Sequence, residues 1–382
     1  MSKLAIGIMS GTSLDGIDIV IANIDGHSED TKVRILAFDT FKYDDSLLVK
    51  IKECLNGYMV APALICSINF ELAYAYSDAV KKSCLKHGFR LDDVDFIASH
   101  GQTIYHINDP INGYVRSSLQ LGDGAVIANQ CKTTVVSNFR TADIAVGGKG
   151  APLVPFADYI LFKDITKNRS LHNIGGIANM TIIDKESSLD DVYAFDSGPG
   201  NMMIDYACKK YYKIEFDQDG EIARKGIVIN ELLEELLTND YLKQSPPKST
   251  GREMFGDEYT EGILHMYHEN RPEDVIRTLT EFTKDTIVNS YKDFILPLTK
   301  IDEIIFSGGG AYNKFLLESI KKDLPQIKIF ALEDIGYNSS SKEALAFIIL
   351  GNETLHHSSS NVLKATGAKE KVILGQVNYV LK

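Results

Sequence analysis

The sequence contains no long apolar run, no block of basic residues and no closely spaced cysteines. None of its apolar segments approaches the length of a membrane span. Lysine and arginine are dispersed and the formal net charge is -12, so a nucleic-acid backbone or an anionic membrane surface is a disfavoured partner. The 5 cysteines form no Cys-x-x-Cys pair, which argues against a disulfide framework or a zinc site. We therefore expect a cytoplasmic enzyme or binding protein that holds any anionic ligand locally.

The length and composition are typical of a globular protein with more than one domain. The chain has 382 residues, of which 44% are hydrophobic and 24% are charged. This length allows about two or three domains of ordinary size, each with its own core.

A stretch of small and polar residues, Gly7 to Ile19, joins two apolar runs near the N-terminus. The runs, Leu4 to Met9 and Ile17 to Asn23, are short and rich in β-branched residues, and Asp15-Gly16 between them is a hairpin signal. We therefore predict two antiparallel strands. Their loop offers backbone N–H groups and little side-chain bulk, as a phosphate cradle requires. The alternative is an ordinary hairpin in which the same residues only satisfy the turn geometry.

The same order of predicted elements occurs twice along the chain. Each half has a meander of short strands, then helices, then an apolar strand that ends in a loop of small residues. In the first half the last strand is Val94 to Ala98 and its loop is Ser99 to Thr103. In the second half the meander turns at Gly175-Gly176, and the last strand, Ile301 to Phe306, ends in a glycine run. Helical periods cover Ser46 to Leu55, Ala61 to His87, Met202 to Tyr212, Asn230 to Leu242 and Pro272 to about Phe294.

This repetition predicts an α/β fold with two domains of one topology that flank an active-site cleft. We place the N-terminal domain at 1–135, with a C-terminal segment of about 355–382 packing back on it. The second domain is expected at 136–354.

Two such halves, each opening with a possible phosphate hairpin, resemble the sugar kinase, Hsp70 and actin superfamily of ATPases, whose domains are ribonuclease H-like. In that pattern Gly11 to Asp18 corresponds to the first phosphate loop. Asn173 to Asn179 corresponds to the second, and Ser307 to Asn313 to the adenosine contact. Together these segments are more specific than any single glycine loop.

Narrower matches resemble the anhydro-N-acetylmuramic acid kinase family over essentially the whole chain. The matching motifs are Met9 to Gly16, Ser99 to Thr103, Gln120 to Asp123, Gly150 to Pro155, Phe195 to Asn201 and Ser249 to Glu253. The sequence departs from the family pattern at Asn138, where Asp is expected, at Lys149, where Gln is expected, and at Leu363, where Pro is expected. These departures bear on local contacts or substrate preference rather than on the phosphate loops.

The resemblance implies a reaction with ATP in which the 1,6-anhydro bond of the sugar is hydrolysed and the freed O6 is phosphorylated, in peptidoglycan recycling. Water must then be activated at C1 by a carboxylate, as in an inverting glycosidase. Asp196, at a strand end before a glycine-rich turn, matches the family's catalytic base. Its alternative role is to cap the helix that follows.

The resemblance also implies binding residues. The candidates for ATP and its phosphates are Ser10, Gly11, Thr12, Ser13, Leu14, Asp15, Gly16, Asn173, Gly175, Gly176, Gly308, Gly309, Gly310 and Asn313. The candidates for the sugar are His100, Gln102, Arg140, Gly198, Asn201, Arg252 and Glu343. Asp15 and Asp18 flank the first loop and are the candidates for Mg²⁺, held directly or through water.

The lactyl carboxylate of the sugar requires a cation, and Arg140 and Arg252 lie in or beside matched motifs. The alternative for Arg140 is a structural pair with Asp143. The alternative for Glu343 is a structural role at the start of a helix, because Ser340-x-x-Glu343 is a capping-box pattern.

Three histidine features have structural alternatives. His100 is a candidate for the sugar but is equally compatible with a buried structural role. His265 with His268, and the pair at 356–357, have no third ligand nearby in the sequence, so we interpret them as solvated surface residues.

We expect small molecules, an amino sugar and ATP, to be the ligands, and the sequence leaves a homodimer open. Two rival functions remain. One is a simple kinase of an open-ring amino sugar, and the other is a catalytically weak regulator that binds a nucleotide or a sugar. The absence of a helix-turn-helix extension argues against a DNA-binding repressor.

Overall fold

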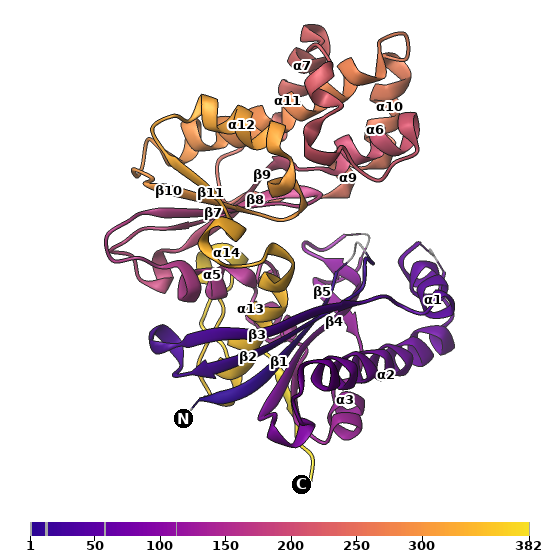
Figure 1. Ribbon diagram of the computed structural model, residues 1–382, viewed down its shortest axis with the longest axis vertical. Helices are drawn as coiled ribbons and strands as arrows, with labels where there is room; N and C mark the ends of the chain where they lie inside the picture. Colours follow the sequence, from indigo (N-terminus) through magenta and orange to yellow (C-terminus); the bar gives the residue numbers. More distant parts are fainter. Residues whose placement is uncertain (1, 12–13, 57–58, 112, 382) are drawn as a thin grey trace. The chain divides into compact units, whose positions relative to one another are not determined.

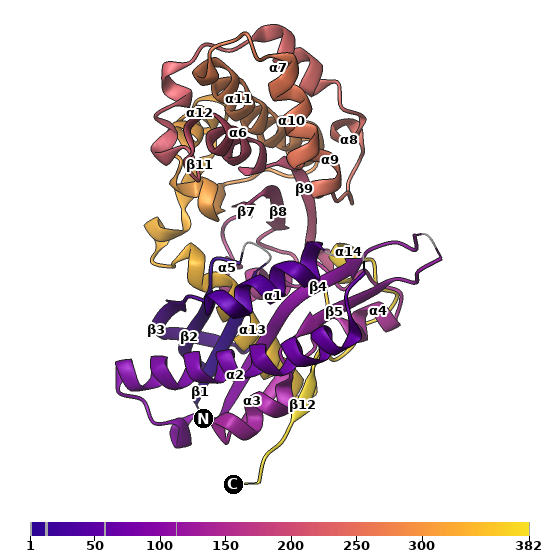
Figure 2. The ribbon, with the colours of Figure 1, turned by 90° about the vertical axis from the view of Figure 1, so that its right-hand side faces the viewer.

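The computed structural model describes residues 2–11, 14–56, 59–111 and 113–381, which divide into two compact units (Figure 1 and Figure 2). Unit 1 comprises Met1–Leu161 and Ser340–Lys382, and unit 2 comprises Phe162–Ser339. No helix in the described ranges is both long and apolar enough to cross a membrane.

Unit 1 is built on a mixed sheet in the order β12-β6-β4-β1-β2-β3, with β5 paired to β4. Its strands are β1 (Lys3–Ser10), β2 (Ile17–Asp25), β3 (Lys32–Phe41), β4 (Phe96–Ile107), β5 (Ser117–Leu121), β6 (Thr134–Ser137) and β12 (Gln376–Asn378). The first three strands form an antiparallel meander, and β4 runs parallel to β1. The predicted hairpin at the N-terminus is therefore confirmed.

Helices cover both faces of this sheet (Figure 2). They are α1 (Asp45–Asn56), α2 (Pro62–His87), α3 (Gly124–Cys131), α4 (Thr141–Ala145), α5 (Val154–Phe162), α13 (Ser339–Leu355) and α14 (Leu363–Thr366). The core on one face joins α1, α2 and α3 to the strands. On the other face α13 lies against the central strands. A Cβ at Gly7 would overlap the carbonyl of Ala344, and one at Gly351 would lie 2.9 Å from Cβ of Ala98, so glycine permits this approach.

Unit 2 has a sheet in the order β11-β10-β7-β8-β9. Its strands are β7 (Arg169–Ile174), β8 (Ile177–Ile183), β9 (Tyr193–Pro199), β10 (Glu303–Ser307) and β11 (Lys328–Ala331). Again the first three strands are antiparallel neighbours, and the fourth runs parallel to the first. The strand order of unit 1 is thus repeated, which confirms the predicted fold class of two ribonuclease H-like, actin-type domains.

The helices of unit 2 lie mainly between β9 and β10 in the sequence. They are α6 (Met202–Tyr212), α7 (Asn230–Leu237), α8 (Asp240–Lys243), α9 (Arg252–Phe255), α10 (Asp257–Met266), α11 (Pro272–Ser290) and α12 (Lys314–Asp323). The sheet packs against α11 and α12, while α6, α7, α10 and α11 share a second core. A π-helical turn, Tyr291–Ile295, ends α11.

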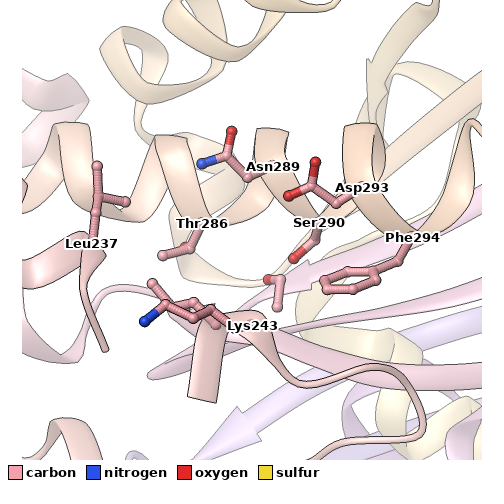
Figure 3. Close-up of a pocket in the computed structure, with 9 residues that line it drawn as sticks. Leu237, Lys243, Thr286, Asn289, Ser290, Asp293 and Phe294 are labelled. Atoms are coloured by element: carbon pink, nitrogen blue, oxygen red, sulfur yellow. The ribbon is translucent and has the colours of Figure 1, made fainter. Parts of the chain in front are cut away.

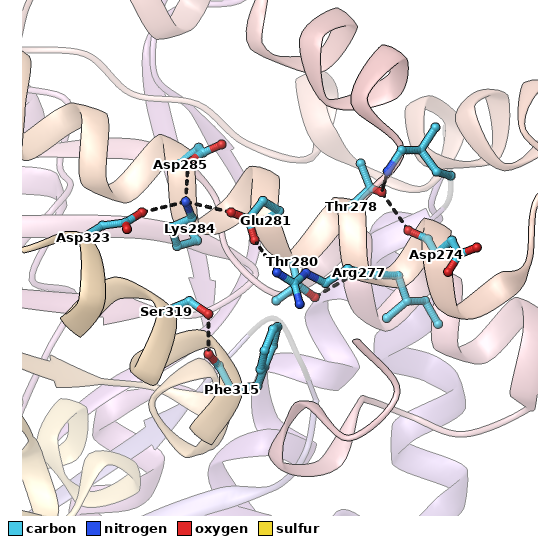
Figure 4. Close-up of polar contacts among 12 residues, drawn as sticks. Asp274, Arg277, Thr278, Thr280, Glu281, Lys284, Asp285, Phe315, Ser319 and Asp323 are labelled. Atoms are coloured by element: carbon cyan, nitrogen blue, oxygen red, sulfur yellow. Dashed lines mark hydrogen bonds and ion pairs between the residues drawn. The ribbon is translucent and has the colours of Figure 1, made fainter. Parts of the chain in front are cut away.

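A buried lysine connects α11 to α12 (Figure 4). Lys284, which is 6% exposed, contacts Asp285 at 2.6 Å, Asp323 at 2.7 Å and Glu281 at 2.8 Å. Burial alone would lower the pKa of Lys284, but the hydrogen bonds to these carboxylates reverse the effect and raise it. The lysine therefore stays charged and holds the helical layer under the sheet.

The division into units differs from the expected domain boundaries. Residues 136–161 stay with unit 1, because β6 pairs with β4 and β12 across the position where the boundary was expected. The C-terminal return begins at Ser340 rather than near 355, since α13 belongs to the core of unit 1. Sequence composition does not reveal which sheet a strand joins.

Two local predictions are also corrected. The segment from Ser99 to Thr103 is not a loop: it lies within β4, which continues to Ile107 through its pairing with β5. The single helix expected from Asn230 to Leu242 is two helices, because the side chain of Asn239 accepts a hydrogen bond from the Tyr241 N–H at 3.0 Å and caps a new start.

Candidate active site

The predicted first phosphate loop leaves β1 at Ser10 and reaches β2 at Ile17. Thr12 and Ser13 lie outside the described residues. Leu14 has a φ of 61°, a left-handed conformation that is uncommon for leucine, and its N–H bonds to the carbonyl of Gly11 at 3.3 Å. Such outliers persist only where the surroundings enforce them, and they cluster at ligand sites.

Two predicted residues make side-chain hydrogen bonds at the entry of this loop. The Ser10 hydroxyl is buried and hydrogen bonds to that of Tyr76 at 2.7 Å. Gln102 is fully buried, accepts from the Tyr43 hydroxyl at 3.2 Å, and donates to the Gly11 carbonyl at 3.2 Å. The polar atoms of both side chains are thus engaged in holding the loop's entry.

Carboxylates gather beside the loop in unit 1. Asp18 accepts a hydrogen bond from the Thr40 hydroxyl at 2.5 Å; burial raises the pKa of Asp18, and the negative charge of Asp15 adds to the rise. Glu343, on α13, keeps access to solvent, yet desolvation by the surrounding protein raises its pKa, and the charge of Asp18 raises it further. Because α13 begins at Ser339, the serine of the suspected capping box lies inside the helix rather than before it.

A buried ion pair fixes the start of α13. Lys342 contacts Asp158 of α5 at 2.8 Å, and both side chains are almost completely buried. Glu343 follows directly in the sequence, so the pair anchors the backbone that carries its carboxylate.

Arg140 supplies the positive charge of this cluster and is hydrogen bonded to His100. The guanidinium donates to Nε2 of His100 at 2.8 Å and to the Gly150 carbonyl at 2.7 Å. Burial and the charge of Arg140 lower the pKa of His100 to about 3, so the imidazole is a neutral acceptor. Among the described residues Arg140 makes no ion pair with a carboxylate, and the suspected pair with Asp143 does not form. A half-buried guanidinium without a counter-ion is suited to binding an anionic ligand.

In unit 2 the hairpin of β7 and β8 turns at Gly175-Gly176 as predicted, and it carries the candidate second phosphate loop. The carbonyls of both glycines accept hydrogen bonds at 2.8 Å, Gly175 from Asn201 and Gly176 from Gly200. Gly308, at the end of β10, approaches the same turn: a Cβ there would lie 2.6 Å from Oδ1 of Asn173. The structure thus brings the two glycine loops of unit 2 together.

Asp196 lies in β9 and is held by hydrogen bonds from a neighbouring segment. Thr250 N–H donates to its Oδ2 at 2.9 Å, and its own N–H donates to the carbonyl of Lys248 at 3.1 Å. The hydroxyl of Tyr241 donates to its backbone carbonyl at 2.7 Å. The carboxylate therefore precedes the turn rather than capping α6, and its position is fixed by groups far along the chain.

The remaining candidates of unit 2 divide into engaged and available groups. Asn313 caps α12 by accepting from the Leu316 N–H at 3.0 Å. Arg252 is exposed at the first residue of α9 and makes no ion pair among the described residues. Gly198 packs against Thr286, since a Cβ added to the glycine would lie 3.1 Å from the threonine side chain.

The contacts of Lys248 and Tyr241 with Asp196 were not predicted from the sequence. Lys248 directly precedes the matched Ser249 to Glu253 motif, which was the available signal. Their importance depends on the packing of this segment against β9, and spacing along the chain does not disclose such packing.

A cavity of about 340 Å³ also lies in unit 2 (Figure 3). Side chains of α11 and the π-helical turn, including Thr286, Ser290 and Phe294, extend toward Lys243 of α8. Ser197 of β9 contributes to the lining.

The two histidine pairs differ in their surroundings. His265, on α10, and His268, in the turn that follows, are exposed and stack with ring centroids 6.0 Å apart. His356 is half-buried rather than solvated, because its ring packs edge-on against His27 and its Nε2 lies 3.3 Å from Nζ of Lys3. No cluster of three metal-ligating side chains occurs in the part of the chain that the structure describes.

The three departures fit their local structure. Asn138 has a φ of 56°, which asparagine tolerates, and accepts from the Thr141 hydroxyl at 2.6 Å. Lys149 lies 3.8 Å from Asp109. Leu363 is the first residue of α14, a position at which proline is favoured but not required.

Asp205, on α6, provides a pH-dependence test of this region. Burial raises the pKa of Asp205 to about 7; Lys209 opposes the rise, and Glu215 and Asp217 increase it. The folded-state pKa exceeds the unfolded one, so stability is expected to fall as the pH rises from about 4 to 7. We expect Asp205→Asn to raise the free energy of unfolding more at pH 8 than at pH 5, by a difference on the order of 1–3 kcal/mol.

Urea denaturation at both pH values would measure this difference, with Asp257→Asn, an exposed residue, as the control. A variant that is equally destabilised at pH 5 and pH 8 would show instead that the carboxylate makes a needed contact.

The family model and the relatives that match this chain have the same description. The family model described as anhydro-N-acetylmuramic acid kinase matches residues 3–380. A protein of that name from Francisella tularensis subsp. novicida (strain U112) is 54% identical over 377 residues, covering 99% of each chain. Another from Clostridioides difficile (strain 630) is 49% identical over 373 residues, covering 98% of this chain and 97% of the relative.

Among solved structures, the activator of the 2-hydroxyisocaproyl-CoA dehydratase from Clostridium difficile covers 91% of this chain and 93% of its own. It is 12% identical with a TM-score of 0.46, and no functional conclusion follows from a likeness at that level. The family match over nearly the full length is decisive: this chain belongs to the anhydro-N-acetylmuramic acid kinase family.

Proposed function

We propose that this protein opens the 1,6-anhydro ring of 1,6-anhydro-N-acetylmuramic acid and phosphorylates O6 with ATP, in the recycling of cell-wall sugar. The products are N-acetylmuramic acid 6-phosphate and ADP. The family membership supports the kinase activity, and the anchored carboxylate of Asp196 is the observation that supports the hydrolytic half.

In the proposed reaction Asp196 takes a proton from water as the water oxygen forms a bond to C1 of the sugar. The bond from C1 to O6 breaks, and O6 forms a new bond to the γ-phosphorus of ATP as the bond to the β-phosphate oxygen breaks. The leaving oxygen of one half-reaction is thus the nucleophile of the other. The hydrogen bond from the Thr250 N–H orients the carboxylate and favours its ionised form.

We assign the glycine loops and the neighbouring backbone to the phosphates and the nucleotide. The candidates on these loops are Gly11, Leu14, Gly16, Asn173, Gly175, Gly176, Gly308, Gly309 and Gly310. Ser10, Gln102 and Asn313 act in this proposal as supports, because their side chains are engaged elsewhere. Arg140 and Arg252 are the candidate cations for the lactyl carboxylate, and His100, Gly198, Asn201 and Glu343 are further candidates for the sugar.

The residues present fit a Mg²⁺ ion. The charge of Asp15 raises the pKa of Asp18, and the charge of Asp18 raises the pKa of Glu343, an arrangement of like charges that a cation relieves. Mg²⁺ commonly takes one or two carboxylates and completes its shell with water and phosphate oxygens, so a cluster of three protein ligands is not required. When bound, the ion would neutralise charge on the phosphates of ATP. Asp18 is the candidate ligand, and Asp15 acts directly or through water.

The test of this function is product analysis with purified protein, ATP and Mg²⁺. We expect ADP and an opened 6-phosphosugar from the anhydro sugar. Open-ring N-acetylmuramic acid is the comparison substrate, with products identified by mass spectrometry and NMR. Phosphorylation of the open sugar alone would support the simple kinase, and binding without turnover of either sugar would support the regulator. We also keep a cytoplasmic location, and self-association into a homodimer, as predictions.

A further inference from the structure

Lys248 places an ammonium group in the interior of unit 2 without a carboxylate partner. The residue is 7% exposed, and its Nζ donates to the carbonyl of Leu242 at 3.0 Å and to that of Tyr241 at 3.4 Å. The rings of Phe294 and Tyr241 face it with centroids 4.6 and 4.9 Å away. Among the described residues, no carboxylate oxygen lies within 4.0 Å of Nζ. Buried lysines are normally paired, so this position is costly.

The segment that surrounds this ammonium, from Tyr241 to Thr250, is also the segment that holds Asp196. Asp196 receives three contacts from this segment. Its N–H donates to the carbonyl of Lys248, its carboxylate accepts from the Thr250 N–H, and its backbone carbonyl accepts from the Tyr241 hydroxyl. Because the ammonium binds the carbonyls of Tyr241 and Leu242, it joins the end of α8 to the irregular stretch that leads to Thr250. Loss of that tie would deprive the carbonyl of Leu242 of the ammonium donor, whereas the carbonyl of Tyr241 also accepts from Gln244.

We propose that Lys248 is a positioning residue for Asp196: its ammonium closes the segment from Tyr241 to Thr250 against β9 and keeps the carboxylate oriented and ionised. This inference rests on the proposed function of Asp196 as the base. A positive charge near a carboxylate favours its ionised form, which is the form that accepts a proton from water.

The charged groups around Lys248 decide its titration. Burial lowers the pKa of Lys248 to about 8, and the charges of Asp293 and Asp196 oppose this. Tyr241, on α8, stays neutral because burial raises its pKa, and the ion pair of Lys243 with Asp240 completes the charges on that helix. The pKa is below that of the unfolded chain, so the buried charge costs stability at neutral pH, and this cost disappears as the pH rises above about 8.

Because the charge of Lys248 lowers the stability of the protein at neutral pH, a variant without the charge can distinguish a positioning role from a purely structural one. Lys248→Met removes the charge and keeps the length of the side chain. At pH 7 we expect its unfolding temperature to be unchanged or higher, while kcat falls about 10- to 100-fold and the KM values for ATP and sugar change less than about threefold. Lys248→Arg keeps the charge and should recover part of kcat.

The pH profile is the second readout. Wild-type kcat should decline as Lys248 loses its proton at about pH 8, whereas Lys248→Arg should keep its activity to higher pH. Lys243→Met, which removes the exposed lysine of α8, is the matched control and should behave as the wild type.

The proposal is overturned if Lys248→Met retains wild-type kcat, or if its loss of activity follows a lowered unfolding temperature and the wild-type profile shows no decline near pH 8. If the methionine variant does not fold, the wild-type profile and Lys248→Arg decide the question. An active Asp196→Asn would refute the proposed base itself, whereas an inactive Asp196→Asn beside a normal Lys248→Met refutes only the role of the lysine.

Discussion

Replacing Asp196 by asparagine is expected to reduce turnover of the anhydro sugar by about 10³-fold, within the range for loss of a positioned general base. The asparagine side chain keeps an oxygen that can accept from the Thr250 N–H, so the local structure should persist. What is lost is the negative charge and the capacity to take a proton from water. Steady-state ADP release, with the unfolding temperature measured alongside, would show a loss of kcat without a loss of folding.

Asp240→Asn is the matched control for this experiment. Asp240 lies on α8, next to the segment that holds Asp196, and its side chain is 95% exposed in an ion pair with Lys243. Exposed pairs contribute about 0–1 kcal/mol, so this variant should retain both stability and turnover. An Asp196→Asn enzyme within about tenfold of the wild type would contradict the assignment of the base.

Gly308→Ala is expected to lower kcat/KM for ATP by about 10²-fold or more and to destabilise unit 2. Gly308 has φ 82° and ψ 175°, a region of backbone conformation that is essentially restricted to glycine. An added Cβ would lie 2.6 Å from Oδ1 of Asn173 and 2.7 Å from the carbonyl of Ile174, so the two glycine loops would have to separate. Steady-state kinetics at varied ATP and nucleotide titration by calorimetry would measure the first effect, and thermal unfolding would measure the second.

Gly336→Ala separates the cost of the backbone conformation from the loss of the site. Gly336 has a similar φ of 86°, yet nothing lies within 4 Å of an added Cβ. This variant should lose only about 1–2 kcal/mol of stability, the usual cost of a left-handed residue, and should bind ATP normally. Equal nucleotide affinity in the two variants would show that the approach of the loops is not needed for binding.

Much of unit 1 and unit 2 could be predicted because local signals agreed with the final fold. The Asp15-Gly16 hairpin and the turn at Gly175-Gly176 are each indicated by turn residues that lie in the loop itself, and α2 ends at His87, as its helical period predicted. The repeated order of elements then indicated two domains of one topology. These features involve neighbours in sequence, and short-range chemistry suffices to specify them.

Predictions were less successful where a partner distant in the sequence decided the outcome. The segment from Ser99 to Thr103 contains small polar residues typical of a loop, but its pairing with β5 extends the strand through it. The domain boundary was displaced because β6 and α13 join the sheet of unit 1. The composition of a strand or helix does not specify which sheet it will join.

By itself the sequence determined the fold class, the family and the identity of the candidate groups, since motifs such as Phe195 to Asn201 keep their residue types and spacing. Only the tertiary structure decided which of those groups are available. Gln102 and Asn313 are engaged in supporting hydrogen bonds, whereas Arg140 makes no ion pair among the described residues. The reason is physical: whether a polar group is satisfied depends on atoms that folding brings within about 3 Å, and these come from segments far apart along the chain.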